Sequence, residues 1–256
     1  VDEGGAPEKV GAIKLLPVDC PDGKLTPELV DREAWGWGDE HRAQPLAVSI
    51  TQTTELGTCY TVDEVRALAD HAHRHGMVLH MDGSRLGNAA SHLGATLAEL
   101  TAEAGVDVLT LGGTKNGLLG AEAVVVIHPE KTHGLHYLRK TNMQLGSKMR
   151  FLSAQLLALY EGDLWLRSAA HANAMATRLA AGIERLAAGG STPGFRLAQR
   201  TESNAVFATV PREAQARARQ EFAFYSWPGD VELVRLMCSF DTTAKDVDAL
   251  LAAFAG

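Results

Sequence analysis

The sequence predicts an α/β protein, with a mostly parallel sheet in a large domain over residues 1–160 and a small α+β domain over residues 161–256. Three observations support this prediction. Short apolar runs alternate with capped helical segments in the first half of the chain, a stretch with helical spacing follows at 152–188, and short strand patterns occupy the rest. A chain of 256 residues is long enough for one large domain or two modest ones.

The first helices are predicted from their N-terminal residues. Thr26 followed by Pro27 is a helix start, because proline suits the first helical position. Thr61 followed by Glu64 is a capping box, in which a hydroxyl and a carboxylate satisfy backbone amides that the first turn of a helix leaves free. Gly76 suits the left-handed residue beyond the end of that helix.

The strands of the large domain are predicted from apolar runs of strand length, at 45–50, 77–81, 106–111 and 123–127. The second run ends at Asp82 and has the pattern of a parallel strand covered on both faces. The last two runs are close enough to pair antiparallel or through a tight turn. Thr96 and Glu99 form another capping box, which starts a helix that we expect to reach about Glu103.

The second half begins with one long or broken helix over 152–188, which we interpret as the bridge between the domains. Strand patterns follow at 204–210 and 232–238, and a closing helix is expected over about 243–254. These elements predict the small α+β domain.

Composition and charge exclude several function classes. The net charge is −7, and the Lys and Arg residues are scattered, so we expect neither a nucleic-acid partner nor a membrane partner. No apolar stretch approaches the ~20 residues that cross a bilayer, and residues 1–5 lack a signal-peptide pattern, so we expect a cytoplasmic protein. Three cysteines without a CxxC pair indicate neither a disulfide framework nor a zinc site.

Asp82 and Lys115 are the first candidates for chemistry. Asp82 ends one predicted strand, and Lys115 follows the next strand 33 positions later, which is the length of one strand-helix-strand unit. Right-handed crossovers bring the carboxyl ends of two such strands to the same edge of a sheet, where α/β proteins bind ligands. We therefore expect the two side chains to share one site.

This pair of residue types fits the cofactor pyridoxal 5′-phosphate (PLP). A lysine amine forms an imine with the cofactor aldehyde, and a carboxylate keeps the pyridine nitrogen protonated. Gly113 would let the backbone approach the cofactor closely, and Thr114 offers a hydroxyl to its phosphate. Spacing alone leaves a second interpretation open, because an Asp at a strand end usually caps the next turn and most lysines are solvated.

Two strings of residues carry a resemblance to a known family. Residues 78–85 are Val-Leu-His-Met-Asp-Gly-Ser-Arg, and residues 111–117 are Leu-Gly-Gly-Thr-Lys-Asn-Gly. They resemble the low-specificity L-threonine aldolases, which are PLP enzymes of fold type I with an aspartate aminotransferase-like architecture. The resemblance extends over the whole chain. It implies that Lys115 is the Schiff-base lysine and that Asp82 is the partner of the pyridine nitrogen.

The resemblance also implies the remaining site residues. The cofactor site would consist of Asp82, Arg85, Gly113, Thr114 and Lys115. Arg85 matches the arginine near the substrate carboxylate, and Arg235 resembles the small-domain arginine that binds the amino acid carboxylate, a role that suits the fork of a guanidinium. The alternatives are a surface arginine at 85 and an ordinary polar strand residue at 235. Fold type I sites are built at a subunit interface, so a homodimer or homotetramer is expected.

Two features depart from the family pattern. Residues 51–58 are Thr-Gln-Thr-Thr-Glu-Leu-Gly-Thr, where many aldolases carry an Asn-Thr-His string, so the preferred substrate is not predicted. The phosphate loop and the ring-stacking histidine of the family normally lie upstream of the segment that resembles residues 1–8. We therefore expect that this sequence lacks an N-terminal segment, and that those contacts lie before Val1.

Three histidines stand near the end of a predicted helix. His71 and His75 are four residues apart and could ligate a metal. His73 lies between them. Imidazoles at a helix C-terminus also interact favourably with the helix dipole, and we predict this ordinary role and no metal site.

The implied activity is the cleavage of L-threonine, L-allo-threonine or a related β-hydroxy-α-amino acid to glycine and an aldehyde. A PLP-dependent β-eliminating lyase and an aminotransferase are alternatives with the same Asp and Lys. A non-catalytic PLP-fold partner or a fragment is an alternative from a different class.

Overall fold

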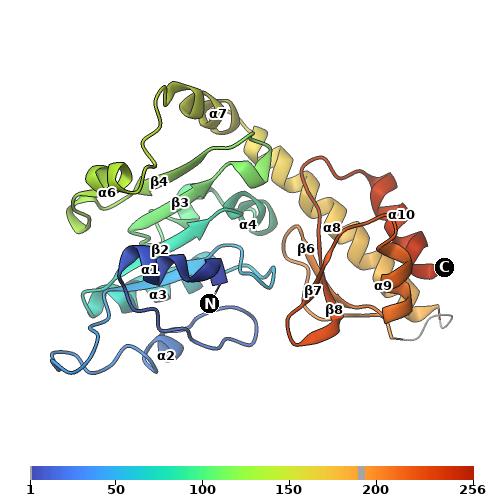
Figure 1. Cartoon of the computed structure of the whole chain (residues 1–256), viewed down its shortest axis with the longest axis horizontal. Coiled ribbons are helices and arrows are strands. Elements are labelled where there is room, and N and C mark those ends of the chain that lie inside the picture. Colours follow the sequence, from blue (N-terminus) through green and yellow to red (C-terminus); the bar gives the residue numbers. More distant parts are fainter. Residues whose placement is uncertain (1, 190–193) are drawn as a thin grey trace.

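Two four-stranded sheets, with helices packed on them, make up the molecule (Figure 1). The computed structural model describes residues 2–189 and 194–256. The first sheet has the strand order β1-β2-β3-β4, and the second has the order β5-β6-β8-β7. Helix α8 runs between the two parts of the molecule in Figure 1.

The first sheet is mostly parallel, as predicted. Its strands are β1 (Ala47–Thr51), β2 (Val78–Gly83), β3 (Val108–Gly112) and β4 (Glu122–Val126). Strand β2 pairs in parallel with β1 and with β3, while β4 pairs antiparallel with β3. All four predicted strands are confirmed to within a few residues. The helices between them are α3 (Val62–Arg74), α4 (Leu86–Leu93) and α5 (Leu97–Leu100).

The strand register fixes where the carboxyl ends of the parallel strands lie. Asp82 of β2 is opposite Thr51 of β1 and Thr110 of β3. These strands run in the same direction, so the loops that follow them leave from one edge of the sheet. Lys115 lies in the loop that leaves β3 at this edge.

One face of the first sheet packs against α3 and forms the core, with buried side chains from Val48, Ile50, Leu79, Met81 and Leu109. On the other face, Ser49 is exposed, and His80 and Asp82 are only half-buried. The prediction that β2 is covered on both faces is therefore wrong for the described residues. The two polar side chains alternate with apolar ones, which is the pattern of a strand packed on one face.

The capping boxes form as predicted. The amide of Glu64 donates to Thr61 Oγ1 at 3.2 Å, and the amide of Thr61 donates to Glu64 Oε2 at 2.7 Å. Helix α5 is shorter than predicted and ends at Leu100. The Thr101 hydroxyl donates to the Leu97 carbonyl at 2.6 Å, and the Thr101 backbone leaves the helical region with φ −128° and ψ −88°.

The long helical stretch is broken into α7 (Arg150–Tyr160) and α8 (Leu164–Ala188). Trp165, near the start of α8, packs against the core of the first sheet. Leu179 and Ile183, farther along α8, are buried in the core of the second sheet. Helix α8 therefore packs with both sheets, while the domain division at residue 160 stays a prediction.

The second sheet is antiparallel throughout. Its strands are β5 (Arg196–Leu197), β6 (Ala205–Thr209), β7 (Tyr225–Trp227) and β8 (Asp230–Met237). Helices α9 (Arg212–Ala218) and α10 (Ala244–Ala255) contribute buried residues to its core. The two predicted strands and the closing helix are confirmed, whereas β5, β7 and α9 were not predicted.

Short elements complete the chain: α1 (Ala6–Gly11), α2 (Pro27–Val30), α6 (Leu135–Thr141) and 3-10 turns at Asp2–Gly5, Thr114–Asn116 and Pro129–Lys131. Thr26 caps α2 through its side chain, as predicted. In the ranges 2–189 and 194–256, no helix has the length and apolar character needed to cross a membrane.

The buried carboxylate of Asp107 joins several parts of the first sheet. Its Oδ2 accepts from the Leu79 amide at 2.7 Å and lies 2.8 Å from His73 Nε2. Its Oδ1 accepts from Lys131 Nζ at 2.6 Å and lies 2.9 Å from His128 Nδ1. Burial favours the protonated acid, but the hydrogen bonds from Lys131, the Leu79 amide and His73 together hold the pKa of Asp107 below its usual range. The carboxylate form is therefore the one that stabilises the fold.

We predict that Asp107→Asn lowers the free energy of unfolding at pH 7 by about 2–3 kcal/mol, because charge-assisted hydrogen bonds are lost. Since the folded pKa of Asp107 is lowered, its contribution is present above the unfolded pKa of about 4 and is lost as pH falls through the folded value. Urea denaturation should therefore show that the free energies of unfolding of Asp107→Asn and of the unmodified protein differ less in acid than at pH 7. Asp70→Asn, on the exposed face of α3, is the control, and equal losses at both positions would contradict this role.

Candidate active site

Asp82 lies at the carboxyl end of β2 with one of its oxygens fixed. Its Oδ1 accepts from the Ser84 amide at 2.9 Å and from the Ser84 hydroxyl at 2.6 Å. Among the described residues, the Asp82 carboxylate makes no other hydrogen bond. The serine thus orients the carboxylate and leaves Oδ2 available to a group that enters the site.

Lys115 lies in the 3-10 turn that follows β3, and its side chain is exposed. The turn is held by its neighbours, since Asn116 Nδ2 donates to the Trp165 carbonyl at 2.8 Å and the Thr114 amide donates to Glu122 Oε1 at 3.1 Å. Within ranges 2–189 and 194–256, no hydrogen bond or ion pair engages the Lys115 amine. An anchored turn with a free amine suits a covalent role for this lysine.

Thr114 and Gly113 make contacts within the protein that the sequence did not indicate. The Thr114 hydroxyl oxygen accepts from the Ala121 amide at 3.2 Å, which leaves its proton free to donate. A Cβ on Gly113 would lie 2.7 Å from the Ala121 carbonyl oxygen. Both residues therefore shape the turn that carries Lys115, and their contacts with a cofactor stay predictions.

Gly112 brings the ends of β2 and β3 together. A Cβ at this position would lie 2.6 Å from Ser84 Cα, so only glycine permits the approach. The Tyr160 hydroxyl donates to the Gly112 carbonyl. Burial, with Glu122 nearby, raises the pKa of Tyr160 to about 12, so this hydroxyl stays protonated and keeps donating at neutral pH.

His80 lies two residues before Asp82, on the same face of β2. Its Nδ1 is 2.9 Å from the Ser49 hydroxyl. Burial lowers the pKa of His80, although Asp82 opposes the shift, and the imidazole is therefore neutral at pH 7. The sequence gave this histidine no role, but it adds a proton-accepting group to the Asp82 face of the sheet.

Arg85 and Arg235 come from different parts of the molecule and meet at one carboxylate. Arg85 precedes α4, Arg235 is in β8, and Glu55 lies in the loop after β1. Arg235 NH1 donates to Glu55 Oε2 at 3.0 Å, and Arg85 NH1 is 3.8 Å from Glu55 Oε1. The side chains of the two arginines are 13% and 21% exposed, whereas that of Glu55 is 59% exposed. The two cations are thus largely buried, and the anion between them is open to solvent.

The pKa of Arg85 is affected by the neighbouring charged groups. Burial is the largest effect and lowers the pKa of Arg85, Glu55 and Asp82 raise it, and the positive charge of Arg235 lowers it further. Arg235 also has a buried Nε with no hydrogen-bond partner among the described residues. The sequence identified both arginines but missed Glu55, for which it held no signal beyond the unusual string at 51–58.

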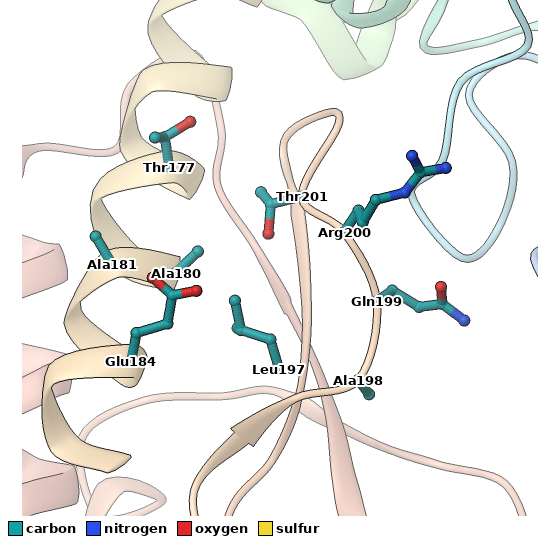
Figure 2. Close-up of a pocket in the computed structure, with 9 residues that line it drawn as sticks. All are labelled: Thr177, Ala180, Ala181, Glu184, Leu197, Ala198, Gln199, Arg200 and Thr201. Carbon is teal, nitrogen blue, oxygen red and sulfur yellow. The ribbon is translucent and has the colours of Figure 1, made fainter. Parts of the chain in front are cut away.

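A separate hollow lies in the second part of the molecule, between α8 and the segment 197–201 (Figure 2). Thr177 and Glu184 of α8 line one side, and Arg200 and Thr201 line the other. None of the residues predicted for the active site lines it, so we do not assign the chemistry to this hollow.

The fold and the site define a class: PLP enzymes of fold type I that act on amino acids. Comparisons with known proteins specify it further. The model of the beta-eliminating lyase family matches residues 1–212. A low specificity L-threonine aldolase from a Pseudomonas species is 41% identical over 253 residues, which cover 98% of this chain and 71% of that protein. A low specificity L-threonine aldolase from Pseudomonas aeruginosa is 40% identical over 251 residues, which cover 97% of this chain and 70% of that protein.

Solved structures agree with the sequence comparison. The structure of Leishmania major threonine aldolase matches with a TM-score of 0.89 and 29% identity, over 99% of this chain and 73% of that one. A putative L-allo-threonine aldolase from Listeria monocytogenes matches with a TM-score of 0.70 and 15% identity, over 100% of this chain and 71% of that one. At this low identity, the match shows the fold alone. The chain belongs to the beta-eliminating lyase family and, within it, to the low-specificity L-threonine aldolases. It is a PLP-dependent carbon–carbon lyase, so the predicted family, fold type and cofactor are confirmed.

We predict that Gly112→Ala displaces the Ser84 backbone, and with it Asp82, and lowers the free energy of unfolding by about 1–3 kcal/mol through overpacking. Thermal and urea unfolding would measure this loss. A titration with PLP would measure whether displacement of Asp82 weakens cofactor binding. Gly120→Ala in the same loop is a matched control, because a Cβ there meets nothing within 4 Å. A Gly112→Ala protein as stable as the control would show that the close approach is not required.

Proposed function

We propose that this chain cleaves the Cα–Cβ bond of L-threonine, L-allo-threonine or a related β-hydroxy-α-amino acid, giving glycine and an aldehyde. One observation carries the proposal most directly. Arg85 and Arg235 converge on a carboxylate near Asp82 in a chain that is 41% identical to a low specificity L-threonine aldolase.

The residues at the sheet edge fit PLP. Lys115 has a free amine to hold the cofactor aldehyde covalently, and Asp82 has a free Oδ2 to hold a proton on the pyridine nitrogen. When bound, PLP accepts the electron pair of the broken bond into its ring. Ser84 keeps the Asp82 carboxylate oriented while it holds this proton. A carboxylate is required here because it stabilises the positive charge of the protonated ring.

The two arginines bind the carboxylate of the amino acid. In the structure, the carboxylate of Glu55 lies near both guanidinium groups, which supports a site for a substrate carboxylate at this position. Glu55 is the exposed partner, so the incoming carboxylate displaces Glu55 and leaves the two buried cations in place. This exchange keeps both guanidinium groups paired at every stage, which avoids the cost of a buried unpaired charge.

The products distinguish this activity from its alternatives. Glycine and an aldehyde from L-threonine support the proposal. A keto acid with ammonia would indicate β-elimination, and a keto acid that forms only with an amino acceptor would indicate transamination. No product, with no bound cofactor, would indicate a non-catalytic PLP-fold protein.

We predict that Lys115→Ala abolishes the visible absorbance of covalently bound PLP, because no other amine replaces Lys115 in the turn after β3. Absorbance spectroscopy of the purified protein with added PLP would measure this. Lys245→Ala, on the exposed start of α10, should keep the absorbance of the unmodified protein. An unchanged visible band in Lys115→Ala would remove this lysine from its proposed role.

We predict that Arg235→Ala and Glu55→Gln change the KM for L-threonine in opposite directions. Loss of the arginine raises KM about tenfold or more, since a charge-assisted hydrogen bond contributes ~1.5–3 kcal/mol. Loss of the competing charge at Glu55 lowers KM by about two- to fivefold, since an exposed ion pair contributes ~0.2–1 kcal/mol. Steady-state kinetics would measure both, with Arg196→Ala on β5 as the control. A higher KM in Glu55→Gln would show that Glu55 supports the arginines instead of competing with the substrate.

We also propose that the chain forms a homodimer or homotetramer in the cytoplasm. Large apolar side chains are more than half exposed from the loop before β4 to the first turn of α7, among them Leu119, Tyr137, Met143 and Phe151. Exposed apolar side chains concentrated in one segment support a subunit contact there. Light scattering of the purified protein would give the number of subunits.

A further inference from the structure

A cluster of three metal-ligating side chains lies outside the active site. Asp31 follows α2, His71 is in the last turns of α3, and His75 follows α3. One oxygen of Asp31 and one ring nitrogen of each histidine all lie within 4.8 Å of one another. The spacing of the two histidines left a metal site open, but we predicted an ordinary helix end from the sequence. The third side chain comes from a residue 40 positions before His71.

We propose that Asp31, His71 and His75 bind one divalent transition-metal ion, with Zn²⁺ as the representative. Two imidazole nitrogens and one carboxylate oxygen are ligands that Zn²⁺ and its neighbours among the transition metals prefer, whereas Mg²⁺ and Ca²⁺ prefer oxygen alone. Three protein ligands leave one position of a tetrahedral ion open to water. Asp31 and His75 are exposed, so water can reach this position.

The ligands are ordered by contacts within the protein. The Trp37 indole stacks on the His75 ring, with centroids 5.5 Å apart and an interplanar angle of 11°. The His71 side chain is only 7% exposed, and its Nε2 lies 2.8 Å from Asp31 Oδ1. Binding a metal therefore requires small movements of groups that already face one another, and little side-chain freedom is lost.

Arg74 competes with the ion. Its NH2 lies 3.3 Å from His71 Nδ1, and because a guanidinium only donates, Nδ1 is the acceptor and Nε2 carries the proton that points to Asp31. A metal on Nε2 requires this proton to move to Nδ1, which breaks the contact with Arg74. The exposed Arg74 side chain can turn into solvent. Removing Arg74 should thus tighten metal binding. If Arg74, His71 and Asp31 served only as a chain of hydrogen bonds, removing Arg74 would weaken that chain and would not tighten metal binding.

The proposed metal site lies at the opposite edge of the sheet from Lys115. Helix α3 ends just before the amino end of β2, and ~13 Å of strand separates Val78 from Asp82. The ion therefore does not touch the reacting groups. It would join the segment that carries Asp31 and Trp37 to α3, which ties an irregular part of the chain to the core.

The test is calorimetric titration of ZnCl2 into the holoenzyme, prepared without a histidine tag and free of amino acid. We expect one ion per chain and a melting temperature that rises with Zn²⁺ concentration. His71→Ala and His75→Gln should each weaken binding by about tenfold or more, and Arg74→Ala should strengthen it. His41→Ala, an exposed histidine in the neighbouring loop, is the control and should bind as the unmodified protein does.

His75 is exposed, so His75→Gln keeps the test valid if His71→Ala fails to fold. The absorption spectrum of bound Co²⁺ would separate this site from any ion held by Cys20, because a thiolate ligand adds an intense band at shorter wavelength. The proposal is overturned if no ion binds, if His75→Gln binds as tightly as the unmodified protein, or if the Co²⁺ spectrum shows a thiolate ligand.

Discussion

One guanidinium group that follows the first sheet and one from the second sheet meet at a single carboxylate, and the organisation of the active site depends on this contact. Arg85 is positioned by the end of β2, Arg235 by β8, and Glu55 by the loop after β1. The contact exists only while the two sheets keep their relative placement. Helix α8 helps to maintain this placement because its Trp165 packs against the first core and its Leu179 and Ile183 are buried in the second.

Much of the fold and the central pair of the site could be predicted because they depend on local patterns. Capping boxes marked the helix starts, apolar runs marked the strands, and the end of a parallel strand placed Asp82 at the edge where Lys115 also lies. Glu55 and Asp31 could not be found in this way. Their partners lie 180 and 40 positions away, and only the packed chain brings them together.

The predictions that were wrong also failed because contacts within the protein were not visible in the sequence. Strand β2 is packed on one face because His80 and Asp82 alternate with its apolar residues, and α5 stops early because Thr101 bonds to its own helix through its hydroxyl. A Cβ on Gly112 would meet the Ser84 backbone, a contact that the sequence did not indicate. In each case a contact within the protein decides the local structure.

The central claim is that Glu55 occupies the place of the substrate carboxylate. A crystal structure of the PLP-loaded enzyme with glycine, the proposed product, tests it most directly. We expect that the glycine carboxylate lies between Arg85 and Arg235 and that Glu55 has moved into solvent. A complex in which Glu55 still bridges the two arginines, with the glycine carboxylate bound elsewhere, would contradict it.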